Sequence, residues 1–275
     1  MICYTFFMIL ICPVCGKKLI KKERSAVCEN NHVFDYAKSG YLNLLISQKA
    51  VHGDGKDMVK ARTEFLSSGA YAFLRDQLAE MTSQDEILAD LGCGEGYYTC
   101  CLQGKEKYGF DLSKDALKHA ARSDRSTAYT VASIFRLPLP DESCDTVLTC
   151  FAPAANEEIE RILKPEGRFI YVTPGPDHLY EMKEILYENP YRNVTEDLKT
   201  GLTLTDSRMI RQTFEASQSM LQNLFMMTPY AYRTAKEDRE RLSQTESLTI
   251  TAEFLIRVYT KIIPRPGMTF ILFPI

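Results

Sequence analysis

The sequence lacks internal repeats, low-complexity stretches and any apolar run long enough to cross a bilayer as a helix. It also lacks an excess of charge of one sign, since 33 Lys and Arg stand against 36 Asp and Glu for a net charge of −3. This balance excludes a uniformly basic nucleic-acid coat but leaves room for a local basic patch. With 45% apolar and 25% charged residues, the 275-residue chain is neither disordered nor fibrous, and it can bury the core of one large domain or two smaller ones.

The nine cysteines are not spread like a secreted disulfide framework. Three of them lie close together near the start, and most of the others fall in or beside apolar segments. An odd number with clustered spacing favours metal ligation plus buried thiols in a reducing compartment. The apolar opening, residues 4–11, has no basic segment before it and no small-residue cleavage site. We therefore expect a cytoplasmic protein that does not enter a membrane.

The charges divide the chain into a basic head and an acidic body. Residues 1–62 hold 10 Lys and Arg against 5 Asp and Glu, which leaves 23 against 31 for the remainder. Residues 46–57 are polar, contain two glycines and are expected to form a linker or mobile loop. We predict a small head domain over residues 1–45 and a larger domain over residues 46–275.

Strands and helices alternate in the body from residue 86 onward. Two helices are expected before that point, at 57–67 and 71–81. The predicted strands are 86–91, 107–110, 127–131, 144–150 and 168–173, with a late strand at 248–259. The predicted helices among them are 97–102, 114–122 and 157–163. Alternation of this kind predicts an α/β fold with a parallel sheet and helices on both of its faces.

The head contains the spacing of a structural zinc site. Cys12 and Cys15 are separated by two residues, and Cys28 and His32 by three. A Cys-x2-Cys turn lets two thiolates point at one ion, and the twelve residues before Cys28 allow a hairpin that returns the second pair to the first. Because four protein ligands leave no open position, this Zn²⁺ is expected to stabilise the fold and not to catalyse.

The hairpin between the two ligand pairs is strongly basic. Residues 17–24 read KKLIKKER and carry five cations. Such a hairpin suits contact with a phosphate backbone, although a solvated charged hairpin is the plainer alternative.

A glycine loop follows the first predicted strand of the body. Gly92, Gly94 and Gly96 let the backbone turn sharply and approach a ligand closely, but the third glycine comes one residue early for a dinucleotide fingerprint. Asp90 and Glu95 crowd the same loop. Two carboxylates suit a pyrophosphate poorly and a cation well, so the loop favours S-adenosylmethionine over NAD.

A second acid ends the next predicted strand. Asp111 comes nineteen residues after Gly92. Dinucleotide sites use an acid about 20 residues past the loop to accept hydrogen bonds from ribose hydroxyls, and an adenosine ribose presents the same groups. Asp111 is therefore the predicted ribose ligand, and a plain helix N-terminal acid is the alternative.

These motifs together resemble a known family. The loop, the ribose acid and the Lys164-Pro165-Glu166-Gly167 turn resemble class I S-adenosylmethionine-dependent methyltransferases. The fuller pattern is similar to the bacterial 23S rRNA (guanine-N1)-methyltransferases over residues 11–261. It consists of the four zinc-site residues and segments 32–35, 40–45, 90–99, 173–179 and 227–229.

The resemblance implies a Rossmann-like domain with a mostly parallel seven-stranded sheet, preceded by a small zinc-binding domain. It implies methyl transfer to N1 of a guanine in a hairpin loop of 23S rRNA, and one branch of the family is linked to macrolide-type resistance. It also implies donor contacts at Tyr71, at Gly94-Glu95 and at His178, and it is compatible with a homodimer. No residue is identified from sequence as the catalytic proton acceptor.

Two other functions stay open at this point. A small-molecule methyltransferase would share the donor loop but would not need a basic zinc head. A zinc RNA-binding protein could retain the donor fold without catalysis. The family pattern also begins after residues 1–7 and has no counterpart for residues 262–275, so these segments have no assigned role.

Overall fold

A computed structural model describes residues 8–46, 53–232 and 234–262. The opening segment with Cys3, the linker residue Lys49 and the tail from residue 263 onward lie outside the described residues. The head forms a three-stranded antiparallel sheet in the order β1-β2-β3. Its strands are β1 (Ile20–Lys22), β2 (Ser25–Val27) and β3 (Val33–Asp35), followed by β4 (Leu42–Asn43).

The body alternates strands and helices as predicted. Its first elements are α1 (Lys56–Ser67), α2 (Ala72–Glu80), β5 (Ile87–Leu91), the 3-10 turn η1 (Thr99–Cys101), β6 (Glu106–Asp111), α3 (Lys114–Ser123), β7 (Thr127–Val131), β8 (Cys144–Cys150), α4 (Asn156–Ile162) and β9 (Leu163–Pro174). The last part comprises α5 (Tyr180–Leu186), β10 (Thr203–Ser217), α6 (Gln218–Met226), η2 (Pro229–Tyr232), α7 (Lys236–Ser243) and β11 (Ser247–Thr260).

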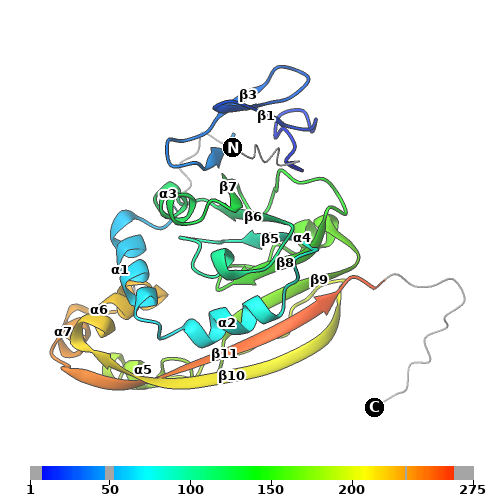
Figure 1. Cartoon of the computed structure of the whole chain (residues 1–275). Helices are drawn as coiled ribbons and strands as arrows, with labels where there is room; N and C mark the ends of the chain where they lie inside the picture. Colours follow the sequence, from blue (N-terminus) through cyan, green and yellow to red (C-terminus); the bar gives the residue numbers. More distant parts are fainter. Residues whose placement is uncertain (1–7, 47–52, 233, 263–275) are drawn as a thin grey trace, which may run out of the picture.

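The large sheet is mostly parallel, in the order β10-β11-β9-β8-β5-β6-β7-β4. Strands β4 through β9 pair in parallel, and β11 and β10 add antiparallel strands at one edge. The sheet has eight strands where seven were expected, because β4 leaves the head and pairs with β7. Figure 1 shows the head beside β7 and the long β10–β11 pair at the opposite edge.

One predicted helix is absent. Residues 97–102 form only the short 3-10 turn η1 and not an α-helix. Few residues separate the glycine loop from β6, which begins at Glu106, so the chain returns to the sheet after a single turn. The prediction of a helix there was wrong, because an apolar pattern of six residues does not distinguish a helix from a turn.

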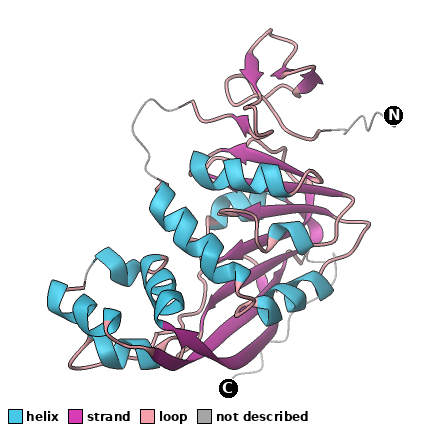
Figure 2. Ribbon diagram, turned by 60° about the vertical axis from the view of Figure 1, so that its left-hand side comes forward, coloured by secondary structure: helices cyan, strands magenta, loops and turns pink. Residues whose placement is uncertain are grey.

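Two apolar clusters cover the two faces of the sheet. Neighbouring residues of one strand point to opposite faces, so Phe169 of β9 joins one cluster and Ile170 joins the other. The first cluster includes Ile159 of α4, and the second includes Phe65 of α1 and Leu74 of α2. Helices therefore cover both faces, as Figure 2 shows.

The head shares the first of these clusters with the body. Leu10 and Leu19 are each 1% exposed and lie in the same cluster as Phe110 of β6. The Ile11 amide donates to the carbonyl of Pro138 at 2.9 Å, and Arg125 Nη1 donates to the carbonyl of Ser39 at 2.8 Å. The head is thus packed against the sheet edge near β7. Among the described helices, none has the length and apolar character needed to span a bilayer.

Candidate functional site

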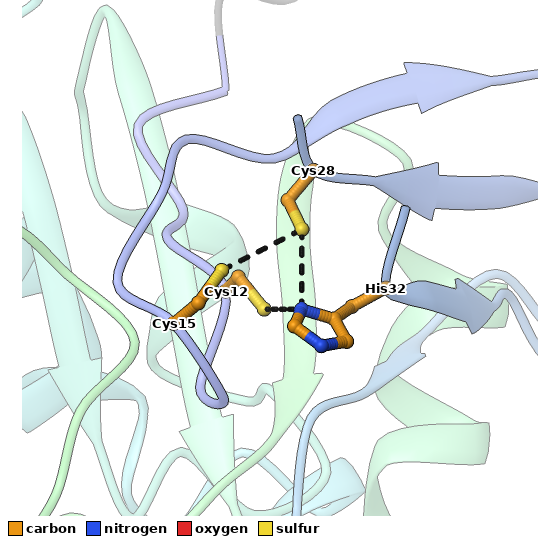
Figure 3. A group of neighbouring side chains, drawn as sticks. All are labelled: Cys12, Cys15, Cys28 and His32. Carbon is orange, nitrogen blue, oxygen red and sulfur yellow. Dashed lines mark hydrogen bonds between the residues drawn. The ribbon is translucent and has the colours of Figure 1, made fainter. Parts of the chain in front are cut away.

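The four predicted zinc ligands converge in the head (Figure 3). Cys12 and Cys15 precede β1, Cys28 follows β2, and His32 precedes β3. Two turns in the left-handed backbone region bring them together. Gly16 has φ +71° and donates its amide to the Cys12 carbonyl at 2.8 Å. Asn31 has φ +60° and donates to the Cys28 carbonyl at 2.9 Å.

The distances among the ligand atoms fit one tetrahedral zinc ion. Cys15 Sγ lies 3.7 Å from Cys28 Sγ, and His32 Nδ1 lies 3.5 Å from Cys12 Sγ and 3.4 Å from Cys28 Sγ. Ordinary zinc bond lengths separate two tetrahedral sulfur ligands by roughly 3.8 Å, and a sulfur from a nitrogen by roughly 3.5 Å. Three thiols and one imidazole at this spacing would fill every position around the ion, which is the composition of a structural site.

A cavity of about 550 Å³ opens beyond the carboxyl ends of β5, β6, β8 and β9. The chain runs from β5 outward through β6 and β7, then returns to build β8 and β9 on the other side, so the cavity lies where the strand order reverses. Open α/β sheets bind ligands at this point. The predicted donor residues that line the cavity are Tyr71, Asp90, Gly92, Glu95, Asp111 and His178.

Gly94 and Gly96 belong to the same loop but do not line the cavity. Two positions of the loop, Gly92 and Gly96, nevertheless accept only glycine, for steric reasons. Gly92 has φ +80°, and a Cβ atom there would lie 2.4 Å from Cβ of Ala152. Gly96 has φ +81°, and a Cβ atom there would lie 2.6 Å from the hydroxyl of Tyr129. Larger residues would push the loop out of this conformation.

The Asp111 carboxylate holds the glycine loop and the start of α3 together. Its Oδ2 accepts from the Gly94 amide at 3.0 Å and its Oδ1 from the Ser113 amide at 2.7 Å. Ser113 caps α3, since its hydroxyl accepts from the Ala116 amide at 3.2 Å. Burial raises the pKa of Asp111, and the two backbone N–H groups partly offset that shift. Ser113 is the helix cap, and Asp111 faces the cavity.

Asp90 is a buried carboxyl with only one of its oxygens bonded. Oδ2 accepts from the Thr99 hydroxyl at 2.5 Å, whereas Oδ1 has no hydrogen-bond partner among the described residues. Burial raises the pKa of Asp90 to about 7, a shift that the Thr99 hydrogen bond lessens and nearby Asp111 increases. A buried oxygen without a partner at the wall of a cavity is suited to a cationic ligand.

Arg62 of α1 enters the cavity wall, and sequence reasoning missed it. Its Nη1 lies 2.6 Å from Asp54 Oδ2 and 3.5 Å from Glu95 Oε2. Burial raises the pKa of Glu95, and Arg62 opposes that rise. No local motif marks Arg62, because the helix that carries it ends at Ser67, well before Gly92, and joins the glycine loop only in three dimensions.

His178 and Tyr71 meet at the other side of the cavity. His178 Nδ1 accepts from the Glu253 amide at 3.3 Å, so a neutral ring carries its proton on Nε2. That nitrogen lies 3.4 Å from the Tyr71 hydroxyl, which leaves the hydroxyl proton of Tyr71 available to a ligand. Burial, with a smaller effect from Lys183, lowers the pKa of His178 to about 3. His178 is therefore neutral near pH 7 and has no free lone pair to accept a proton.

Two family models and several relatives match the chain. A zinc-ribbon model described as "RlmA, N-terminal" matches residues 10–50, and a model described as "Methyltransferase domain" matches residues 89–171. A Streptomyces fradiae protein named 23S rRNA (guanine(748)-N(1))-methyltransferase is 30% identical, covering 90% of this chain and 95% of the relative. The Bacillus subtilis (strain 168) protein YxjB, provisionally named a 23S rRNA (guanine-N(1)-)-methyltransferase, is 29% identical, covering 93% and 98%.

Replacing Cys15 by Ser should release zinc and unfold residues 12–32 locally, because ligand binding supplies most of the folding energy of such small metal sites. Elemental analysis should find about one zinc per wild-type chain and much less in the variant. Hydrogen exchange should show loss of protection in the head and retention in the body. The control is Cys101→Ser, a partly exposed thiol outside the cluster, which should keep its zinc. A wild-type chain without stoichiometric zinc would refute the assignment.

Titration of Asp90 should make the free energy of unfolding depend on pH. Its folded pKa of about 7 lies above the ordinary value of 3.8, so the folded chain holds the proton more tightly than the unfolded chain between these values. The associated stability is fully present below pH 4 and is lost as pH rises toward 7. In the ligand-free protein, Asp90→Asn should therefore lose less stability than wild type between pH 5 and 7, by up to about 1.4 kcal/mol per pH unit. Urea unfolding at pH 5, 6 and 7 measures this difference, and parallel curves would contradict it.

Proposed function

Because the chain belongs to the family of 23S rRNA (guanine-N1)-methyltransferases, we propose that it transfers a methyl group from S-adenosylmethionine to N1 of a guanine in 23S rRNA. The observation that carries this proposal is the acidic cavity behind the glycine loop, on a sheet to which a zinc head is attached. A homodimer stays a prediction, and cytoplasmic location is proposed from the rRNA substrate.

The charges of the cavity support a cationic donor. Four carboxylates line it, and Arg62 is the only Arg or Lys among the described residues that line it. The two acids beside the loop, Asp90 and Glu95, would hold the cationic methionine part. Asp111 would accept from the ribose hydroxyls, and Tyr71 would offer its ring or its hydroxyl proton. A pyrophosphate would meet repulsion from the same carboxylates, which argues against a dinucleotide.

The protein would accelerate the reaction mainly by positioning the guanine and the methyl donor relative to each other. S-adenosylmethionine supplies an activated methyl group on a sulfonium. Holding a guanine in line with that group converts a bimolecular encounter into a step within one complex, which lowers the barrier by several kcal/mol. Guanine N1 must also lose its proton. His178 cannot accept it, because Nδ1 is occupied by the Glu253 amide and Nε2 carries the ring proton. We assign no side chain to that step.

The mouth of the cavity supports a flipped base as the acceptor. Phe151 follows β8, lines the cavity and is 42% exposed, with its backbone in the left-handed region at φ +61°. Its ring centroid lies 5.3 Å from that of Phe254 and 6.2 Å from that of Tyr98, so packing supports the ring while part of the residue stays exposed. We propose that the target guanine, in a hairpin loop, turns outward and stacks on Phe151.

The basic hairpin of the head would contact the rRNA backbone. Lys17, Lys21 and Lys22 are exposed, and the Lys17–Glu29 ion pair is long, at 3.8 Å between two exposed side chains. Such a pair contributes little, so Lys17 can exchange it for a phosphate.

The direct test of the function is primer extension on 23S rRNA from a strain that lacks this chain. Methylation at N1 blocks Watson–Crick pairing and stops the polymerase. We expect one stop to disappear in the deletion strain and to return when purified protein and S-adenosylmethionine are added to that rRNA. An unchanged pattern of stops would overturn the proposal.

Asp111→Ala should weaken donor binding by about 1.5–3 kcal/mol, the value of a hydrogen bond to a charged group, or roughly 10- to 150-fold. The loss includes the anchoring of the Gly94 amide. Calorimetry with S-adenosylmethionine measures it, with exposed Asp85→Ala as the matched control. Affinity for rRNA should stay unchanged. Equal donor affinity in both variants would remove Asp111 from the donor site.

Replacing Lys17, Lys18, Lys21 and Lys22 by Ala should weaken rRNA binding and flatten its salt dependence. Each lost phosphate contact reduces the slope of log affinity against log salt by roughly 0.7–0.9. Filter binding at several salt concentrations gives the slope, and donor affinity should not move. A slope equal to that of wild type would place the RNA surface elsewhere on the chain.

A further inference from the structure

A second hollow, of about 420 Å³, lies between α1 and α3 and is separate from the donor cavity. We call it the α1–α3 groove. The residues that line it are Lys56, Val59, Lys60, Thr63 and Glu64 of α1 with Asp115, Lys118, His119 and Arg122 of α3. These positions are spaced three and four residues apart on each helix, so each helix turns one face toward the groove.

The facing sides of this helix pair are cationic where packed helices are ordinarily apolar. Val59 is the buried apolar residue among the lining positions, whereas Lys56, Lys60, Lys118 and Arg122 are all exposed. The groove therefore concentrates four cations in a body whose net charge is negative. Because like charges repel, these facing cations do not stabilise the packing of α1 against α3.

The acids of the groove do not balance these cations. Lys60 lies 3.7 Å from Glu64 in an exposed pair, and the other oxygen of Glu64 accepts from Asn223. Within the described ranges, Lys56, Lys118 and Arg122 make neither an ion pair nor a hydrogen bond through their side chains. Asp115 lies in the first turn of α3, where the helix dipole favours an acid. The groove thus offers cations to an external anion.

The α1–α3 groove adjoins both parts of the proposed RNA path. Helix α1 is the wall between the two hollows, because Met58 and Arg62 face the donor cavity while Lys56 and Lys60 face the groove. Just past the C-terminal end of α3, Arg125 Nη1 donates a hydrogen bond to the Ser39 carbonyl of the head at 2.8 Å. Figure 1 shows α3 directly beneath the head, with α1 next to it.

We propose that the α1–α3 groove binds the sugar–phosphate backbone of the substrate RNA on its way from the head to the donor cavity. The proposal rests on the proposed function, since it assigns that substrate a third contact surface. Phosphates match the charge of the groove, and the groove lies between the head, which Arg125 contacts, and the donor cavity, which α1 borders. The contacts are to the backbone and carry no base specificity.

The experiment compares salt slopes for three double variants and wild type on a 23S rRNA fragment that wild type methylates. Lys118→Ala/Arg122→Ala removes one wall of cations, and Lys56→Ala/Lys60→Ala removes the other. The matched control is Lys199→Ala/Lys236→Ala, which removes two exposed cations away from the groove. Each groove variant should flatten the slope by roughly 1.4–1.8, for two lost contacts, and the control should not. The KM for RNA should rise, while kcat and donor affinity by calorimetry stay at wild-type values.

The outcomes separate this proposal from the function itself. If wild type methylates no rRNA fragment, the proposed function fails first. If wild type is active and both groove variants have the slope of the control, the groove proposal is overturned and the function stands. An equal loss of affinity without a change of slope would also overturn it, because that result indicates a packing defect. Circular dichroism melting of each variant keeps misfolding distinct from lost contacts.

Discussion

The hydrogen bonds of one carboxylate join three segments at the donor side of the molecule. Asp111 accepts from the Gly94 amide and from the Ser113 amide, so it joins the loop after β5, the end of β6 and the start of α3. The close approach at Gly92 and Gly96 leaves that loop little other freedom. This small network fixes the glycine loop against the capped start of α3 at the wall of the cavity.

The electrostatics of the cavity follow from burial. Acids removed from water bind protons more readily, which is why burial raises the pKa values of Asp90, Glu95 and Asp111. Arg62 offsets part of that cost for Glu95, but Asp90 keeps one oxygen without a partner among the described residues. A cationic ligand would offset the remainder. Burial of His178 keeps the opposite wall of the cavity neutral.

The head and the body are joined more closely than two domains on a linker. The side chains of Leu10 and Leu19 lie in the same core as Phe110, and β4 adds the end of the predicted head to the sheet of the body. A zinc ion would therefore stabilise not only the small hairpin but also the direction in which it projects its cations. Division of the chain at residue 45 stays a prediction, and β4 lies just before that point.

The sequence alone determined the features that depend on local spacing. One Cys–Cys pair and one Cys–His pair predict a zinc site because the ligands lie on tight turns. The glycine loop and Asp111 mark a ligand site because each lies at the end of a strand. Tertiary structure decided the rest. Arg62 reaches Glu95 only once α1 packs beside the sheet, and His178 takes its tautomer from the distant Glu253 amide. The helix expected at 97–102 became a turn, since the path between strands, and not the apolar pattern, decides how the chain returns.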